Sequence, residues 1–174
     1  MSLNFLEMKI NSRPVHFSDL KHNLEVCDNL FLQHQLQLMH KNAEQALVLF
    51  EKIVLIRGLH LEIMEDLLLP EFIKISDQIP AGARPLYFER EKKQILKFLD
   101  KYVRNLGSIV LHSTELNIVL LFEEYAWLKD LLDHHDAREK AFLFPILDTR
   151  LEPSLKKQLL QNVAKKLSPL EELS

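Results

Sequence analysis

The sequence predicts an all-α protein, an antiparallel up-down four-helix bundle with a short additional C-terminal helix. Three observations predict this fold. The 174 residues include only three glycines, far too few for a turn-rich β protein. The seven prolines leave two long proline-free blocks, one from Pro14 to Pro70 and one from Pro85 to Pro145. Along both blocks, apolar residues recur at steps of three and four residues, which is the spacing of one helix face.

Each proline-free block is long enough for two helices. As one straight helix, a block would extend roughly 80 Å at about 1.5 Å per residue, about twice the width of a domain of this mass. Each block is therefore expected to fold back as a helical hairpin, with the segment 70–85 joining the two hairpins. The bundle core covers about 18–146, and the whole chain, 1–174, is expected to form a single domain.

Polar residues and one glycine mark the expected turn within each hairpin. In the first, Asn42 suits the N-cap position, with Gln45 three residues later as in a capping box. In the second, Gly107 suits the position after a helix end. Ser113 or Thr114 would then cap the following helix.

The segment from about 153 to 168 is predicted to form the additional C-terminal helix. Its apolar residues share one face, and most of its lysines lie off that face. Packing across the open end of its own bundle is the favoured interpretation. Packing against a second copy of the chain, which would give a homodimer, stays open.

Polar residues interrupt the apolar faces of the four long helices at His34, His60, Lys92, His135 and Glu139. A charged group in a bundle core costs several kcal/mol unless it is paired or bound to a metal. For a single core histidine, a hydrogen bond to a backbone carbonyl explains burial as well as a metal does. A histidine and a glutamate four residues apart on one face shift the balance towards a ligand pair.

The two halves of the chain repeat at an offset of 75 residues, the separation of His60 from His135. At this offset Pro70 aligns with Pro145, and Met64 stands where Glu139 stands. The repeat indicates a bundle made of two related hairpins.

The stretch HHDAREKAFLFP resembles the hemerythrin-like (HHE cation-binding) family. The mark of that family is a histidine, a glutamate four residues later and an apolar helix end closing in Phe-Pro, once per hairpin. His135, Glu139 and Phe144-Pro145 match this pattern, and His60 with Leu69-Pro70 matches it in part.

The resemblance covers roughly residues 18–146, and it implies a non-haem iron protein. In the family, the first helix of each hairpin adds a further histidine, and two irons are bound among the ligands. The associated roles include binding O2 or NO, sensing oxidative stress and repairing iron centres.

Distance from the hairpin turn selects His22 as the further histidine of the first hairpin. Two residues of an antiparallel hairpin meet when they are about equally far from the turn, and His60 lies 18 residues past Asn42. Its partner should therefore lie near residue 24, and His22 fits. His34 and His40 lie too close to the turn, so we interpret them as structural or exposed.

Two expected ligand positions depart from the family pattern. Met64 replaces the glutamate of the first hairpin, and Lys92 stands at or near the place of the histidine of the third helix. A lysine about 5 Å from a divalent ion is repelled by roughly 6–7 kcal/mol at an effective dielectric constant of ~20. A complete di-iron centre is therefore disfavoured.

Two functions remain open. In the first, one iron ion is held by two histidines and a carboxylate, a set that suits ferrous iron with open positions for a small diatomic ligand. The candidate metal ligands are His22, His60, His135 and Glu139. In the second, Lys92 replaces the metal by pairing with Glu139, and the metal-free bundle serves as an interaction or dimerisation module.

Composition and motifs argue against several other classes. The net charge of −3 and the lack of a basic cluster argue against nucleic-acid binding. Apolar runs are short and interrupted by charge, so no membrane span is expected. A single cysteine and no recognisable signal peptide are typical of a cytoplasmic protein. No Glu-x-x-His, His-Glu-x-x-His, Cys-x-x-Cys or glycine-rich phosphate loop occurs, which favours a binding protein over an enzyme.

Overall fold

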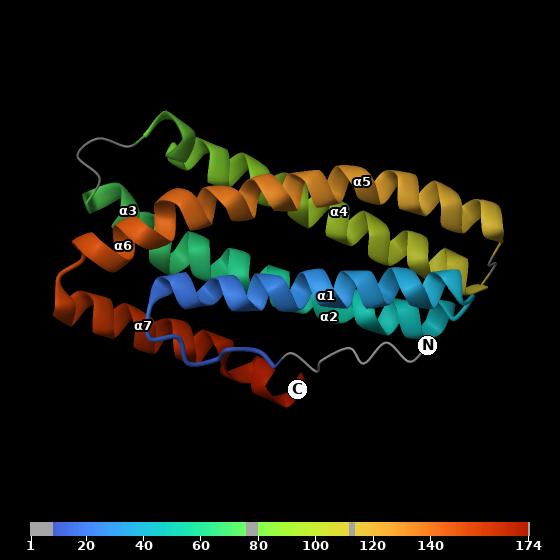
Figure 1. The fold of residues 1–174 in the computed structure, drawn as a ribbon, viewed down its shortest axis with the longest axis horizontal. Coiled ribbons are helices and arrows are strands. Elements are labelled where there is room, and N and C mark those ends of the chain that lie inside the picture. Colours follow the sequence, from blue (N-terminus) through green and yellow to red (C-terminus); the bar gives the residue numbers. More distant parts are fainter. Residues whose placement is uncertain (1–8, 76–79, 112–113, 174) are drawn as a thin grey trace.

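The structure is a computed structural model that describes residues 9–75, 80–111 and 114–173. Within these ranges the protein is all-α and contains no strand, as predicted. Four long helices pack together with a shorter C-terminal helix (Figure 1). The long helices are α1 (Lys21–Met39), α2 (Ala43–Ile63), α4 (Pro85–Leu111) and α5 (Glu115–Arg138), and the C-terminal helix is α7 (Pro153–Leu167).

The four long helices form two antiparallel hairpins that lie against each other. α1 lies alongside α2, and α4 pairs with α5 (Figure 1). Contacts of α2 with α4 and of α1 with α5 close the bundle. The remaining elements are short: α3 (Leu69–Ile75), α6 (Phe144–Arg150), π-helical turns at Met64–Leu68 and Glu139–Leu143, and 3₁₀ turns at Phe17–Leu20, Ala81–Ala83 and Ser168–Leu173.

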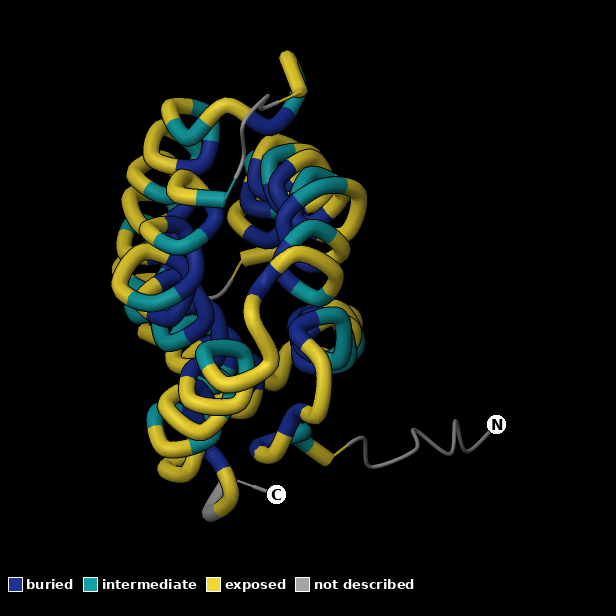
Figure 2. Tube along the Cα trace, turned by 90° about the vertical axis from the view of Figure 1, so that its left-hand side faces the viewer, coloured by how far each residue is buried: buried dark blue, intermediate teal, exposed yellow. Residues whose placement is uncertain are grey.

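Buried residues occur along all four long helices. In the view of Figure 2, they lie on the sides of the helices that face one another. One cluster, between the four long helices, is rich in aromatic residues. The other lies at the end where α3, α6 and α7 meet. Leu159, Val163 and Leu167 of α7 belong to it, so the apolar face predicted for this helix covers its own bundle.

The turn predictions are confirmed in part. Asn42 is the residue before α2, although its side chain makes no capping hydrogen bond. Thr114 caps α5, and its hydroxyl accepts a hydrogen bond from the N–H of Asn117 at 3.2 Å. The alternative cap, Ser113, lies outside the described residues. The prediction for Gly107 is wrong: α4 continues through it to Leu111, and a Cβ there would meet no atom within 4 Å.

The internal repeat is visible in the backbone. A π-helical turn at Met64–Leu68 leads into α3, and a second one at Glu139–Leu143 leads into α6, at the same offset of 75 residues as the sequence repeat. In the second turn, the N–H of Phe144 donates to the carbonyl of Glu139, five residues back. Isolated π-turns occur mostly within α-helices and often at functional sites. The two hairpins therefore share an irregular end next to the predicted ligands.

No helix within the described ranges combines the length and the apolarity that a membrane span requires.

Candidate functional site

Three of the four predicted ligands come together in the core. His60 lies on α2, His135 on α5, and Glu139 is the first residue of the π-helical turn that follows α5. The Nε2 atom of His60 lies 2.9 Å from Oε2 of Glu139, and the Nε2 atom of His135 lies 3.0 Å from Oε1. The Glu139 side chain is 0% exposed. One buried carboxylate thus stands between two imidazoles that come from different hairpins.

A second carboxylate fixes the orientation of the His135 ring by holding the nitrogen that faces away from Glu139. Its Nδ1 lies 3.0 Å from Oε2 of Glu91 on α4, and Glu91 also accepts a hydrogen bond from Nη2 of Arg138 at 2.8 Å. A carboxylate at Nδ1 holds the proton on that nitrogen and turns Nε2 to the interior. This outer carboxylate is a common support for a histidine that binds a metal.

The contact between His135 and Glu139 is close but badly aligned. The two side chains belong to consecutive helical turns, and their facing atoms, Nε2 and Oε1, lie 3.0 Å apart. Among the described residues, neither of these two buried atoms has a hydrogen-bond partner. A buried polar atom without a partner costs about 1–3 kcal/mol. These two atoms can therefore gain a partner if a proton or a cation binds between them.

The site is strongly charged. Burial alone would lower the pKa of His135, but the negative charge of the nearby Glu139 and the hydrogen bond to Glu91 outweigh it and raise that pKa to about 9. Burial would raise the pKa of Glu139, but the imidazoles of His60 and His135 hold it well below the usual range. At neutral pH, an imidazolium therefore neutralises a carboxylate in the core.

This ion pair predicts a pH-dependent stability. The pKa of His135 is about 9 in the folded protein and about 6.5 in the unfolded chain, so folding takes up a proton between these values. The stabilisation is complete below about pH 6.5 and is lost as the pH rises through about 9, a loss of about 3 kcal/mol. Urea denaturation at both ends of this range measures it. His135→Gln is expected to flatten the profile, and an equally steep profile in that variant would assign the effect to another group.

The structure does not bring His22 to the site. Its Nε2 lies 2.8 Å from the carbonyl oxygen of Lys9, on a half-exposed face of α1. Distance from the turn fixes the height of a residue along the hairpin but not its rotation about the helix axis, and His22 has the wrong rotation.

Lys92 does not pair with Glu139, so the predicted replacement of the metal by a lysine is wrong. Lys92 forms an ion pair with Glu65 at the edge of the bundle, where Glu65 is more than half exposed. The residue of α4 that reaches the site is its neighbour, Glu91. Met64 is buried, and its thioether cannot replace the second carboxylate of the family pattern.

The interpretation of His34 and His40 is confirmed. His34 is buried, with Nδ1 at 2.7 Å from the carbonyl oxygen of Ala46 and Nε2 at 2.7 Å from the hydroxyl of Tyr125. Burial lowers the pKa of His34 to about 4, which keeps its ring neutral. His40 is exposed at the hairpin turn.

A second buried ion pair lies beside the site, and the sequence reading missed it. Arg57 of α2 donates from Nη1 and Nη2 to the two oxygens of Asp136 on α5, at 2.6 and 2.9 Å. Both side chains are almost fully buried. Asp136 follows His135, and Arg57 lies one turn before His60, so the ion pair joins the same two helices as the site.

The chain matches no family model, no curated protein and no solved structure. Whether a metal fits the site must therefore be judged from the types and positions of its donor atoms. Among the described residues, no group of three or more His, Cys, Asp and Glu side chains is already arranged around a metal position. The two imidazoles face different oxygens of Glu139. The types of donor fit one ion, whereas a single carboxylate does not offset the charge of two.

Proposed function

We propose that the bundle binds one divalent metal ion, with non-haem iron as the first candidate, through His60, His135 and Glu139. One observation carries the proposal: the Nε2 atoms of two histidines from separate hairpins lie within 3.0 Å of a single buried carboxylate. The resemblance to hemerythrin-like proteins supports the same assignment. When bound, the metal would supply open positions for a small diatomic ligand such as O2 or NO.

The surrounding residues support a single ion. Glu91 holds the Nδ1 side of His135, so that its Nε2 is the nitrogen offered to a metal. Metal ligands must be deprotonated, so binding displaces the proton that His135 carries at neutral pH. Affinity is therefore expected to rise with pH up to about 9.

Anaerobic loading with ferrous iron, followed by elemental analysis and calorimetry, tests the proposal. The wild-type protein is expected to retain about one equivalent and to release protons on binding. His135→Gln and Glu139→Gln are expected to retain far less. Two exposed residues of α5 provide matched controls, His134→Gln and Glu123→Gln, and these should load like the wild type. Loading well below one equivalent in the wild type, or equal loading in His135→Gln, would rule the site out.

A metal-free interaction module is the second candidate, and two observations favour it. The imidazolium of His135 already neutralises Glu139 without a metal. α5 also exposes apolar side chains, with Trp127 72% exposed and Leu116 65% exposed. Under this candidate, the loading experiment gives no stoichiometric metal, and sedimentation detects self-association that Trp127→Ser weakens.

A further inference from the structure

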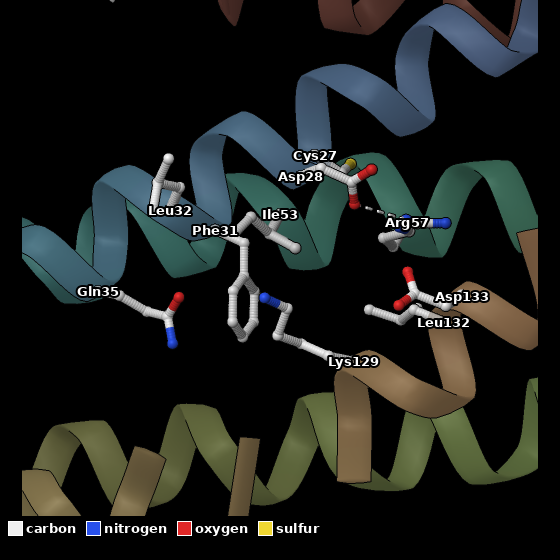
Figure 3. Close-up of a pocket in the computed structure, with 10 residues that line it drawn as sticks. All are labelled: Cys27, Asp28, Phe31, Leu32, Gln35, Ile53, Arg57, Lys129, Leu132 and Asp133. Carbon is white, nitrogen blue, oxygen red and sulfur yellow. Dashed lines mark ion pairs between the residues drawn. The ribbon is translucent and has the colours of Figure 1, made fainter. Parts of the chain in front are cut away.

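A cavity of about 330 Å³ opens between α1, α2 and α5, and Arg57 forms part of its wall (Figure 3). Its volume falls within the usual range for small-molecule sites, roughly 300–1,000 Å³. Phe31, Ile53 and Leu132 give it an apolar floor. The thiol of Cys27 adds a neutral patch, because burial raises its pKa to about 12.

The two ends of the cavity differ in charge. At one end, Asp28 and Asp133 lie on either side of Arg57 (Figure 3). Arg57 gives both of its terminal nitrogens to Asp136, so its charge is already largely compensated. Asp28 lies 3.6 Å from Arg57, and Asp133 makes no hydrogen bond or ion pair within the described part of the chain. This end therefore carries surplus negative charge.

The opposite end carries donors. Figure 3 shows the ammonium group of Lys129 beside the ring of Phe31, with the amide of Gln35 beyond it. The ammonium nitrogen lies 5.9 Å from the centroid of that ring. Neither Lys129 nor Gln35 forms a hydrogen bond or an ion pair with another described residue. Both are free to meet an anionic oxygen.

The wall between the two acidic residues is held rigidly in place. Arg57 is 2% exposed and is fixed by its two hydrogen bonds to Asp136. The cavity wall at this end is therefore preformed, which favours binding because little side-chain order has to be created when a ligand enters.

We propose that this cavity binds a small zwitterion with an apolar body, of the chemical class of a free amino acid with a large apolar side chain. The ammonium of the ligand lies between Asp28 and Asp133, its carboxylate meets Lys129, which is one helical turn from Asp133 on α5, and its side chain covers Phe31. This proposal is independent of the metal, since none of the proposed metal ligands lines the cavity.

Binding of L-phenylalanine to the ¹⁵N-labelled, metal-free protein tests the proposal, with phenethylamine and 3-phenylpropionate as probes that each lack one charge. Titration to about 10 mM covers the weak affinities expected of such a small ligand. We expect L-phenylalanine to shift amide signals in 27–35 and 129–133, and each single-charge probe to bind at least about threefold more weakly. Absence of shifts, or equal binding of phenethylamine, would overturn the proposal.

Variants at the mouth of the cavity complete the test, because both changed side chains are exposed and the fold does not depend on them. Asp133→Asn and Lys129→Gln should each weaken the binding of L-phenylalanine by roughly three- to fivefold. Glu123→Gln and Lys97→Gln, at exposed positions outside the cavity, should leave it unchanged. Unchanged binding in Asp133→Asn would contradict the predicted place of the ammonium.

Discussion

Replacing Glu139 by leucine is expected to lower the free energy of unfolding by about 3–5 kcal/mol, the usual cost of removing one partner from a buried ion pair. The change leaves His60 and His135 facing an apolar group in the core, where His60 loses its carboxylate partner and His135 keeps only Glu91. His135 would then lose the charge that raises its pKa. Urea denaturation at pH 6.5 and pH 9 measures both effects, because the loss should be larger at the lower pH.

The exposed residue Glu123 gives the matched control for this substitution. Glu123→Leu changes the same side chain on the surface of α5, and its effect should stay within about 0.5 kcal/mol. The loss of unfolding free energy in Glu139→Gln should lie between the losses in Glu139→Leu and Glu123→Leu, since an amide still offers one acceptor to an imidazole. If Glu139→Leu were as stable as the wild type, the network would not hold the bundle together.

Breaking the second ion pair is expected to have an effect of similar size. Arg57→Met should cost about 3–5 kcal/mol, because it leaves the buried carboxylate of Asp136 without its bidentate partner. Asp136→Leu should be equally costly, because the buried guanidinium then keeps, among the described residues, only the longer ion pair with Asp28, at 3.6 Å.

The double variant Arg57→Met/Asp136→Leu separates the value of the pair from the cost of a lone charge. Replacing a whole buried pair by apolar residues of similar volume is often close to neutral, so the double variant should recover most of the loss. The double-mutant cycle should therefore give a coupling energy of roughly 2–3 kcal/mol or more. Additive losses would show that the two side chains act independently.

The fold could be predicted from the sequence because helix-forming patterns and proline-free blocks are local features. Within the candidate site, the spacing of His135 and Glu139 and the repeat that contains His60 were sufficient to predict that these three side chains lie together. The sequence did not determine which residue of α4 faces the site. Between Phe88 and Ile95, Glu91 fits the three-and-four spacing as well as Lys92 does, and only packing decides that Glu91 faces His135.

The sequence does contain a pattern that indicates the Arg57–Asp136 pair. Arg57 lies four residues after Ile53 and four before Leu61, both buried, so it falls on an inward face of α2. Asp136 lies four residues after the buried Leu132. Opposite charges at two inward positions predict a partnership, but which residues meet depends on how far one hairpin is displaced along the other, and no local pattern encodes that.

The π-helical turns change how positions along this chain must be counted. One extra residue is accommodated within each of 64–68 and 139–143, so the side chains beyond are rotated by about 100° from where an uninterrupted α-helical count would place them. A comparison with another helical protein that treats 115–150 as one unbroken helix would therefore match core residues with surface residues after position 143. Allowing a one-residue gap in each turn would restore the match, and distant relatives of this chain are best sought with that allowance.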